Sequence, residues 1–142
     1  MKICFISDPQ SVHIQRWAAA FAGKGHEVYL MWSRTFPIKG VKMIQVDLQL
    51  SHVTIAPLRW YLLLKNTLKR RWILHKLQPD IVHVHELTWG WANLGFWKMH
   101  NLVVSTWGAD ILAEGQTTLD EFSKRFLMKQ ASVITATTHF LG

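Results

Sequence analysis

The chain has 142 residues, of which 49% are hydrophobic and 18% charged, so it can fold as one domain and is not a disordered segment. A single cysteine, Cys4, excludes a disulfide framework within the chain, and no apolar run approaches the ~18 residues of a membrane-spanning helix. The net charge of +7 is concentrated in residues 57–78, which contain six Lys and Arg and no acidic residue.

The first half of the chain alternates nearly continuous apolar runs with amphipathic stretches. Apolar runs without alternation indicate strands that are buried on both faces. From Ser11 the apolar residues recur at helical spacing until two glycines end the pattern, and Pro57 opens a long basic helix. The strands expected in this half are Lys2–Ser7, His26–Trp32 and Val41–Asp47, and the helices are Ser11–Ala22 and Pro57–Leu77.

The second half repeats this alternation around residues 79–110, the stretch that organises the chain. Two β-branched runs are separated there by a segment of about helical length, which is typical of a parallel β-α-β unit. Residues 118–121 have the pattern of a capping box, which predicts the start of another helix. The strands expected in this half are Ile81–His85, Leu102–Thr106 and Ser132–Thr137, the helices are Leu87–Met99 and Thr118–Gln130, and residues 108–116 form a loop.

This order of elements predicts the α/β class. We expect one domain, residues 1–142, with a Rossmann-like, doubly wound, mostly parallel sheet of about six strands and helices on both faces. Ligands of such sheets bind outside the carboxyl ends of the strands, an edge that we call the rim. The segments after Ser7, His85 and Thr106 are therefore expected to meet at the rim and to form the site.

The loop after the first strand leads into a helix N-terminus, where free amide donors and the helix dipole favour an anion. We expect Gln10, Ser11 and His13 to contact a sugar or phosphate there, and the alternative is a capped turn without a ligand. The segment lacks the G-x-G-x-x-G pattern, so the dinucleotide-binding fingerprint is absent.

Two histidines and a glutamate end the fourth expected strand. His83 and His85 alternate and so share one face of that strand. A metal site would need a third ligand and none is evident, so no metal is expected. We interpret His83 as a hydrogen-bonded core residue. We expect His85 and Glu86 to open into a cleft, where a histidine beside a carboxylate can act as a base or orient a hydroxyl group.

The fifth expected strand is followed by Trp107, Gly108, Ala109 and Asp110. Glycine permits close approach of the backbone to a ligand, and tryptophan offers a flat apolar face to a sugar ring. Asp110 is expected to accept hydrogen bonds from hydroxyl groups or to serve as a base, and the alternative is a helix cap or a salt bridge to a neighbouring loop.

The helix expected at 57–78 mixes basic with aromatic and aliphatic residues, a combination that suits an anionic membrane surface. The alternative is an ordinary solvated face, and nucleic acid is not expected because no recognition motif accompanies the charge. The residues expected to contact a membrane are Arg59, Lys65, Lys69, Arg70, Arg71 and Lys76, and those expected to be buried are Leu58, Tyr61, Leu62, Leu64, Leu68, Trp72 and Leu77.

Five motifs in order, KICFIS, HIQRWAAAFAGKGHEVYLMW, PDIVHVHE, LVVSTWGADIL and SVITATTHFL, resemble the amino-terminal half of family 4 (group 1) retaining glycosyltransferases. The resemblance implies a two-domain GT-B enzyme. We expect it on the cytoplasmic side, where the basic helix would place it near anionic lipid, peripheral on the inner face of the membrane. Its first domain would bind a glycan or lipid-linked acceptor. Its second would hold a nucleotide-sugar donor through paired glutamates, so no cofactor is expected in residues 1–142.

The chain departs from the family pattern at two places. The first loop lacks a glycine pair, and Trp107 stands where many members carry a histidine implicated in catalysis. A branch of the family has a Trp-Gly-x-Asp version, which makes Asp110 and His85 the expected catalytic residues.

The donor-binding domain is absent from this sequence, so the 142 residues alone are expected to be inactive. The alternatives are half of a GT-B-type sugar-nucleotide epimerase, or a non-catalytic membrane-recruiting subunit that partners a separate donor-binding chain.

Overall fold

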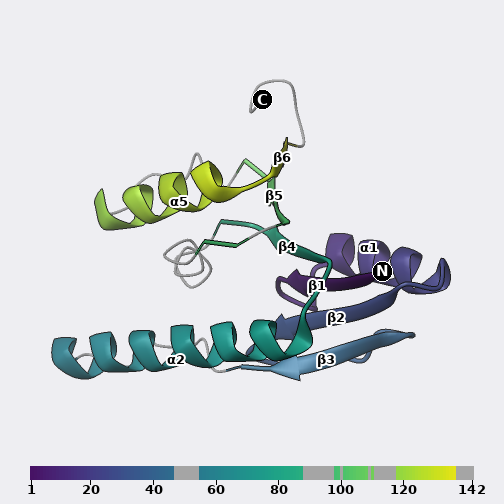
Figure 1. Cartoon of the computed structure of the whole chain (residues 1–142), viewed down its shortest axis with the longest axis horizontal. Helices are drawn as coiled ribbons and strands as arrows, with labels where there is room; N and C mark the ends of the chain where they lie inside the picture. Colours follow the sequence, from purple (N-terminus) through teal and green to yellow (C-terminus); the bar gives the residue numbers. More distant parts are fainter. Residues whose placement is uncertain (47–54, 88–97, 100, 109, 111–117, 137–142) are drawn as a thin grey trace.

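A computed structural model describes residues 1–46, 55–87, 98–99, 101–108, 110 and 118–136 (Figure 1). Its six strands form one sheet in the order β3-β2-β1-β4-β5-β6, and every neighbouring pair is parallel. The elements are β1 (Lys2–Ile6), α1 (Val12–Gly23), β2 (Glu27–Trp32), β3 (Val41–Gln45), α2 (Ala56–Leu77), β4 (Ile81–His85), β5 (Leu102–Thr106), α5 (Thr118–Gln130) and β6 (Val133–Ala136).

The parallel, doubly wound sheet predicted from the sequence is confirmed, and the expected strands shift by no more than two residues at either end. Most of the helix expected at Leu87–Met99 lies outside the described residues, and Lys98 and Met99 at its end are irregular. Asp110 is helical, so the loop expected over 108–116 is wrong at that residue. The side chain of Thr118 lies outside the described part, which leaves the capping box a prediction.

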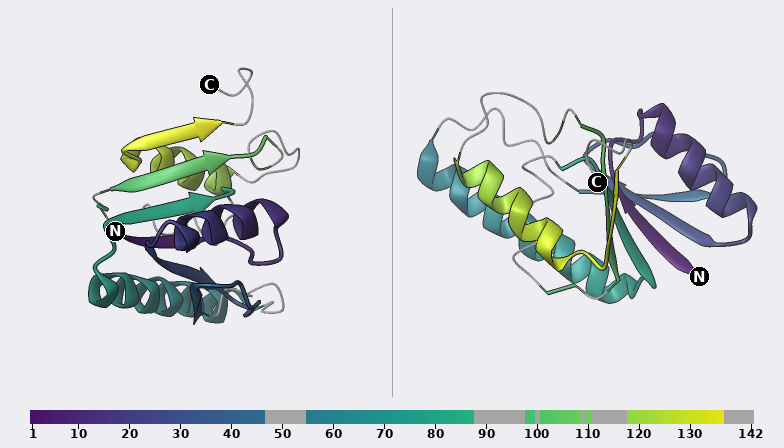
Figure 2. Two further views of the ribbon diagram at one scale, coloured as in Figure 1. Left: turned by 90° about the vertical axis from the view of Figure 1, so that its right-hand side faces the viewer. Right: turned by 90° about the horizontal axis from the view of Figure 1, so that it is seen from above.

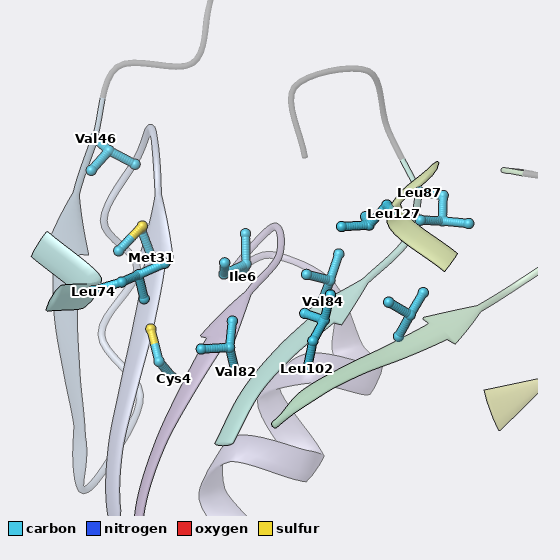
Figure 3. Packing of buried hydrophobic residues seen from close by; sticks show 11 residues of the cluster. Cys4, Ile6, Met31, Val46, Leu74, Val82, Val84, Leu87, Leu102 and Leu127 are labelled. Atoms are coloured by element: carbon cyan, nitrogen blue, oxygen red, sulfur yellow. The ribbon is translucent and has the colours of Figure 1, made fainter. Parts of the chain in front are cut away.

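Helices cover both faces of the sheet (Figure 2), with α1 on one face and α2 and α5 on the other. Successive strand residues point to opposite faces, so central strands such as β1 and β2 contribute to two cores. Figure 3 shows the larger core, to which α2 contributes Leu74 and α5 contributes Leu127, together with strand residues such as Ile6 and Val84. The smaller core under α1 contains Ile3, Phe5, Ile14, Ala18, Val28 and Leu30.

Cys4 lies in the larger core, and burial raises the pKa of its thiol to about 12. A thiol that does not ionise near neutral pH is a poor nucleophile, so Cys4 is a structural residue.

The topology fixes where a ligand can approach. From β1 the chain moves outward to β2 and β3, and α2 then leads it back to β4, on the other side of β1. The direction of winding therefore reverses between β1 and β4. In open α/β sheets such a switch point opens a crevice at the carboxyl ends of the two strands, because the connections leave in opposite directions.

Candidate functional site

The rim is formed by the carboxyl ends of β1, β4 and β5, which are adjacent in the sheet. The loop Ser7–Ser11 follows β1, Glu86 and Leu87 follow β4, and Trp107, Gly108 and Asp110 follow β5. The three segments that the sequence predicted to meet therefore do meet on one side of the molecule.

The loop after β1 is held by its own polar groups. The backbone N–H of Gln10 donates to Asp8 Oδ1 at 2.9 Å, and the N–H of Ser11 donates to the Asp8 carbonyl at 3.1 Å. Gln15 Nε2 donates to the Pro9 carbonyl at 2.9 Å. The hydroxyl of Ser11, at the N-cap of α1, makes no capping bond to the helix. The turn is thus shaped by Asp8, while the expected contact residues Gln10 and Ser11 lie at the rim.

His13 and Trp107 join the first and third segments. Their ring centroids are 4.3 Å apart with a 37° angle between the planes, and His13 is exposed while Trp107 is half-buried. An aromatic ring held this way presents a flat apolar surface with a polar imidazole beside it. Such a pair suits a ligand that has both CH faces and hydroxyl groups, as a sugar ring has.

Asp110 connects the second and third segments through both of its carboxylate oxygens. Oδ2 accepts the backbone N–H of Leu87 at 2.7 Å, and Oδ1 accepts the backbone N–H of Trp107 at 3.0 Å. Gly108, which follows Trp107 in this turn, is buried and has φ +86°, a left-handed conformation that glycine adopts without strain. The carboxylate therefore connects the backbone of two rim segments. Its expected catalytic role stays a prediction.

Glu86 lies in the middle of the rim in an unusual backbone conformation. Its φ is +70°, and its N–H donates to the Ser105 carbonyl at 3.1 Å at the point where the strand ends. Burial raises the pKa of this carboxyl, and the negative charges of Asp110 and Asp8 raise it further, while His13 lowers it. A left-handed glutamate with a raised pKa at a switch point is typical of a functional position.

His85 does not open into the cleft, which corrects the sequence expectation. Only 2% of the residue is exposed, because Trp17 of α1 covers the ring from one side with a centroid distance of 5.6 Å. Phe5 and Trp107 lie at 5.7 and 6.0 Å. Neither ring nitrogen has a hydrogen-bond partner among the described residues. Burial, followed by the charges of His83 and His13, lowers the pKa of His85 to about 3.

His83 is the hydrogen-bonded core residue that the sequence predicted. Its Nε2 lies 2.7 Å from Ser105 Oγ, which lies 2.7 Å from Thr135 Oγ1, and burial lowers the His83 pKa to about 4. These three side chains form a hydrogen-bonded row from β4 to β6. The sequence did not predict this row, although Ser105 and Thr135 are paired residues of neighbouring parallel strands. The ring of His85 packs against that of His83 at a centroid distance of 4.1 Å, so the row supports the base of the rim.

Lys124 is a further residue that sequence reasoning missed. It is buried on α5, and its Nζ donates to the Asp110 carbonyl at 2.5 Å. The available signal was its position three residues before Leu127, which places both on the inner face of the helix.

Two expectations for α2 are wrong. Arg70 is buried, with 1% of its surface exposed; its Nε donates to the Asn66 carbonyl at 3.2 Å, and burial lowers its pKa to about 10. The helix turns this arginine toward the sheet and turns apolar residues outward, so Leu58, Tyr61, Leu64, Leu68 and Trp72 are exposed instead of buried.

Most other residues singled out on α2 are half-buried or exposed, and contact with a membrane stays a prediction. Leu62 and Leu77 are half-buried. The side chain of Arg59 lies outside the described part, and the expected cations Lys65, Lys69, Arg71 and Lys76 are exposed.

No group of three or more His, Cys, Asp or Glu side chains within the described ranges is arranged to hold a metal ion. The carboxylate of Asp110 at the rim is instead used as a hydrogen-bond acceptor. The rim carries aromatic, carboxyl and imidazole groups, as Trp107, Glu86 and His13.

The sequence is similar to a known protein family. A family model described as glycosyl transferase 4-like matches residues 2–138, which include every strand and all three rim segments. No curated protein matches the chain.

Proposed function

The chain belongs to the glycosyl transferase 4-like family, and we propose that it forms the acceptor-side domain of a retaining glycosyltransferase. The enzyme would transfer a sugar from a nucleotide-sugar donor to a glycan or lipid-linked acceptor. The observation that carries this proposal is the meeting of His13, Glu86 and Trp107 on one rim at the switch point of the sheet.

The chemistry of the rim supports an acceptor sugar. The Trp107 ring can pack against the CH face of a pyranose, and the adjacent His13 imidazole can exchange hydrogen bonds with its hydroxyl groups. Glu86, with its raised pKa, can orient or deprotonate the hydroxyl group that attacks the donor. These three side chains come from three different segments, so they can contact one ring from several directions.

Asp110 and His85, the expected catalytic residues, take a positioning role in this proposal. Asp110 holds the backbone at Leu87 and Trp107, and the ring of His85 packs beside that of Trp107. Both fix the geometry of the groups that would contact the acceptor. The donor would be bound by a second lobe that closes over the rim, as the family resemblance implies.

The proposal is tested by saccharide binding and by product analysis. In isothermal titration calorimetry, a panel of mono- and oligosaccharides should include ligands whose affinity falls at least about 10-fold in Trp107→Ala, since the stacking face is lost. Phe122→Ala removes an exposed ring from α5 and serves as the matched control. An equal loss of affinity in Phe122→Ala would contradict an acceptor site at Trp107. A complete lack of saccharide binding by the parent and by both variants would contradict it as well.

The reaction type needs the donor-binding lobe, supplied in the same chain or as a separate protein. With nucleotide sugars and a bound acceptor, the product should keep the anomeric configuration of the donor, as read by NMR. An isomerised sugar formed without any acceptor would instead establish the epimerase alternative.

A further inference from the structure

Helix α2 is amphipathic in the reverse sense to an ordinary surface helix. The side that faces the sheet buries Thr67, Arg70 and Leu74. The opposite side exposes an apolar stripe: Tyr61 (61% exposed), Leu64 (58%), Leu68 (47%) and Trp72 (58%). Because an α-helix has 3.6 residues per turn, positions 61, 64, 68 and 72 lie one above another. A helix that buries an arginine and exposes leucine and tryptophan has an unpartnered apolar face.

The stripe is bordered by positive charge. Lys65, Lys69 and Lys76 are exposed along one side of it and Arg71 along the other. Lys76 Nζ lies 4.9 Å from the centre of the Trp72 ring, so its stem follows the apolar surface while its charge stays outside. The helix itself contains no acidic residue between Ala56 and Leu77. We call the four apolar and four basic residues the outer face of α2.

We propose that the outer face of α2 binds the surface of an anionic membrane. The helix would lie flat, with Leu64, Leu68 and the rings of Tyr61 and Trp72 in the boundary between headgroups and acyl chains. The lysines beside the stripe would pair with lipid phosphates. Both parts of the surface are then used, whereas an uncharged apolar partner would leave the lysines without a role.

Other occupants fit less well. No described helix is long and apolar enough to cross a bilayer, so α2 is suited to lie on the surface. A second copy of the chain packed on the same face would bring Lys65, Lys69 and Lys76 close to their own equivalents, and like charges repel. Nucleic acid would meet the charges but would leave the apolar stripe in water.

The direction of α2 would place a bound membrane near the rim. The helix starts after the carboxyl end of β3, so its first turns, with Tyr61, lie on the rim side of the sheet. In Figure 1 and the right-hand view of Figure 2 these turns extend past the ends of the strands. A membrane along α2 would pass beside the rim, where a lipid-linked acceptor is presented. This consequence rests on the proposed function, whereas membrane binding itself does not.

The proposal is tested by co-sedimentation of the purified protein with vesicles of phosphatidylcholine, with and without phosphatidylglycerol. The protein should sediment with the anionic vesicles and be released by raised salt, because screening weakens the lysine contacts. Substituting Lys65, Lys69 and Lys76 together by Gln should lower the partition coefficient about 100-fold. Substituting Leu64, Leu68 and Trp72 together by Gln should lower it at least about 10-fold.

Matched controls use exposed residues on other elements. Val12→Gln with Phe122→Gln removes exposed apolar groups from α1 and α5, and Lys24→Gln with Lys39→Gln removes exposed charges, and both should bind as the parent does. Thermal denaturation confirms that each variant is folded. Absence of parent binding to anionic vesicles, equal loss in the controls, or a dimer that the α2 substitutions dissociate would each overturn the proposal. None of these results depends on saccharide binding at Trp107, so the two proposals can fail separately.

Discussion

Asp110 Oδ2 accepts the backbone N–H of Leu87 at 2.7 Å, so the turn after β5 is fastened to the end of β4. The second oxygen accepts the N–H of Trp107 at 3.0 Å, and the Asp110 carbonyl accepts a hydrogen bond from Lys124. One residue thereby fixes two of the three segments that form the rim and links them to α5. Its carboxylate holds the backbone, and the groups proposed to contact a ligand are its neighbours.

The first prediction concerns this connection. Asp110→Ala should lower the free energy of unfolding by about 1–3 kcal/mol, because partly buried amides lose their acceptor. Asp110→Asn keeps one acceptor oxygen and should lie between the parent and the alanine variant. Urea denaturation measures the stabilities, and amide NMR shifts at Leu87 and Trp107 report the loss of the bonds. Glu121→Ala, an exposed acid on α5, is the control. Unchanged amide shifts in Asp110→Ala would show that the carboxylate does not hold these groups.

The second prediction is that the two histidines of β4 respond oppositely to the same substitution. His85 has no hydrogen-bond partner for either nitrogen among the described residues, so His85→Phe should leave the free energy of unfolding unchanged or higher. His83→Phe removes the 2.7 Å bond to Ser105 and should cost about 1–2 kcal/mol. Chemical denaturation of both variants makes the comparison. A larger loss in His85→Phe than in His83→Phe would mean that His85 has a polar partner and would return it to the groups that contact a ligand.

The difference between these histidines shows how much of the site could be predicted from the sequence. Apolar β-branched runs predicted the strands, and the topology predicted which strand ends would meet, because both depend on local pattern and general chain geometry. Alternation placed His83 and His85 on one face but could not say what covers that face. Trp17 belongs to α1, and β2, β3 and α2 separate it from His85 in the chain. Its ring covers His85 only in the folded protein, so no local pattern could predict the burial.

Helix α2 shows a second limit of the same kind. Apolar residues occur all around this helix, so its sequence does not single out one stripe for the core. The side that packs is chosen by the sheet, which accepts Leu74 together with Thr67 and Arg70. The basic character of the helix was predictable, but which of its cations are exposed and which is buried was not.

The third prediction follows from the burial of Arg70. Arg70→Met should lower the free energy of unfolding by about 2–4 kcal/mol, because the guanidinium bond to the Asn66 carbonyl and the close packing of the side chain are lost. Lys69→Met, one position earlier and exposed, should change it by no more than about 0.5 kcal/mol. Thermal and urea denaturation of both variants provide the measurement. Equal stabilities of the two variants would show that the Arg70 side chain is not anchored in the folded protein.

The fourth prediction is a loss of stability in mild acid. Burial lowers the pKa of His83 to about 4 and that of His85 to about 3, whereas both titrate near ~6.5 in the unfolded chain. Below about pH 6.5 the unfolded state therefore binds more protons, and stability falls as the pH drops toward the folded-state values. Between about pH 6.5 and 5.5 each histidine should remove about 1 kcal/mol from the free energy of unfolding.

The contribution of His85 is isolated by comparing the parent with His85→Phe, because Glu86, whose pKa is raised, acts in the opposite direction in both proteins. Urea denaturation across this pH range should show a loss about 1 kcal/mol smaller in His85→Phe, since one buried proton acceptor is gone. An identical pH dependence in the two proteins would mean that His85 is protonated as easily in the folded state as in the unfolded chain. Its ring would then have to be accessible to water, and the cover formed by Trp17 would have to open.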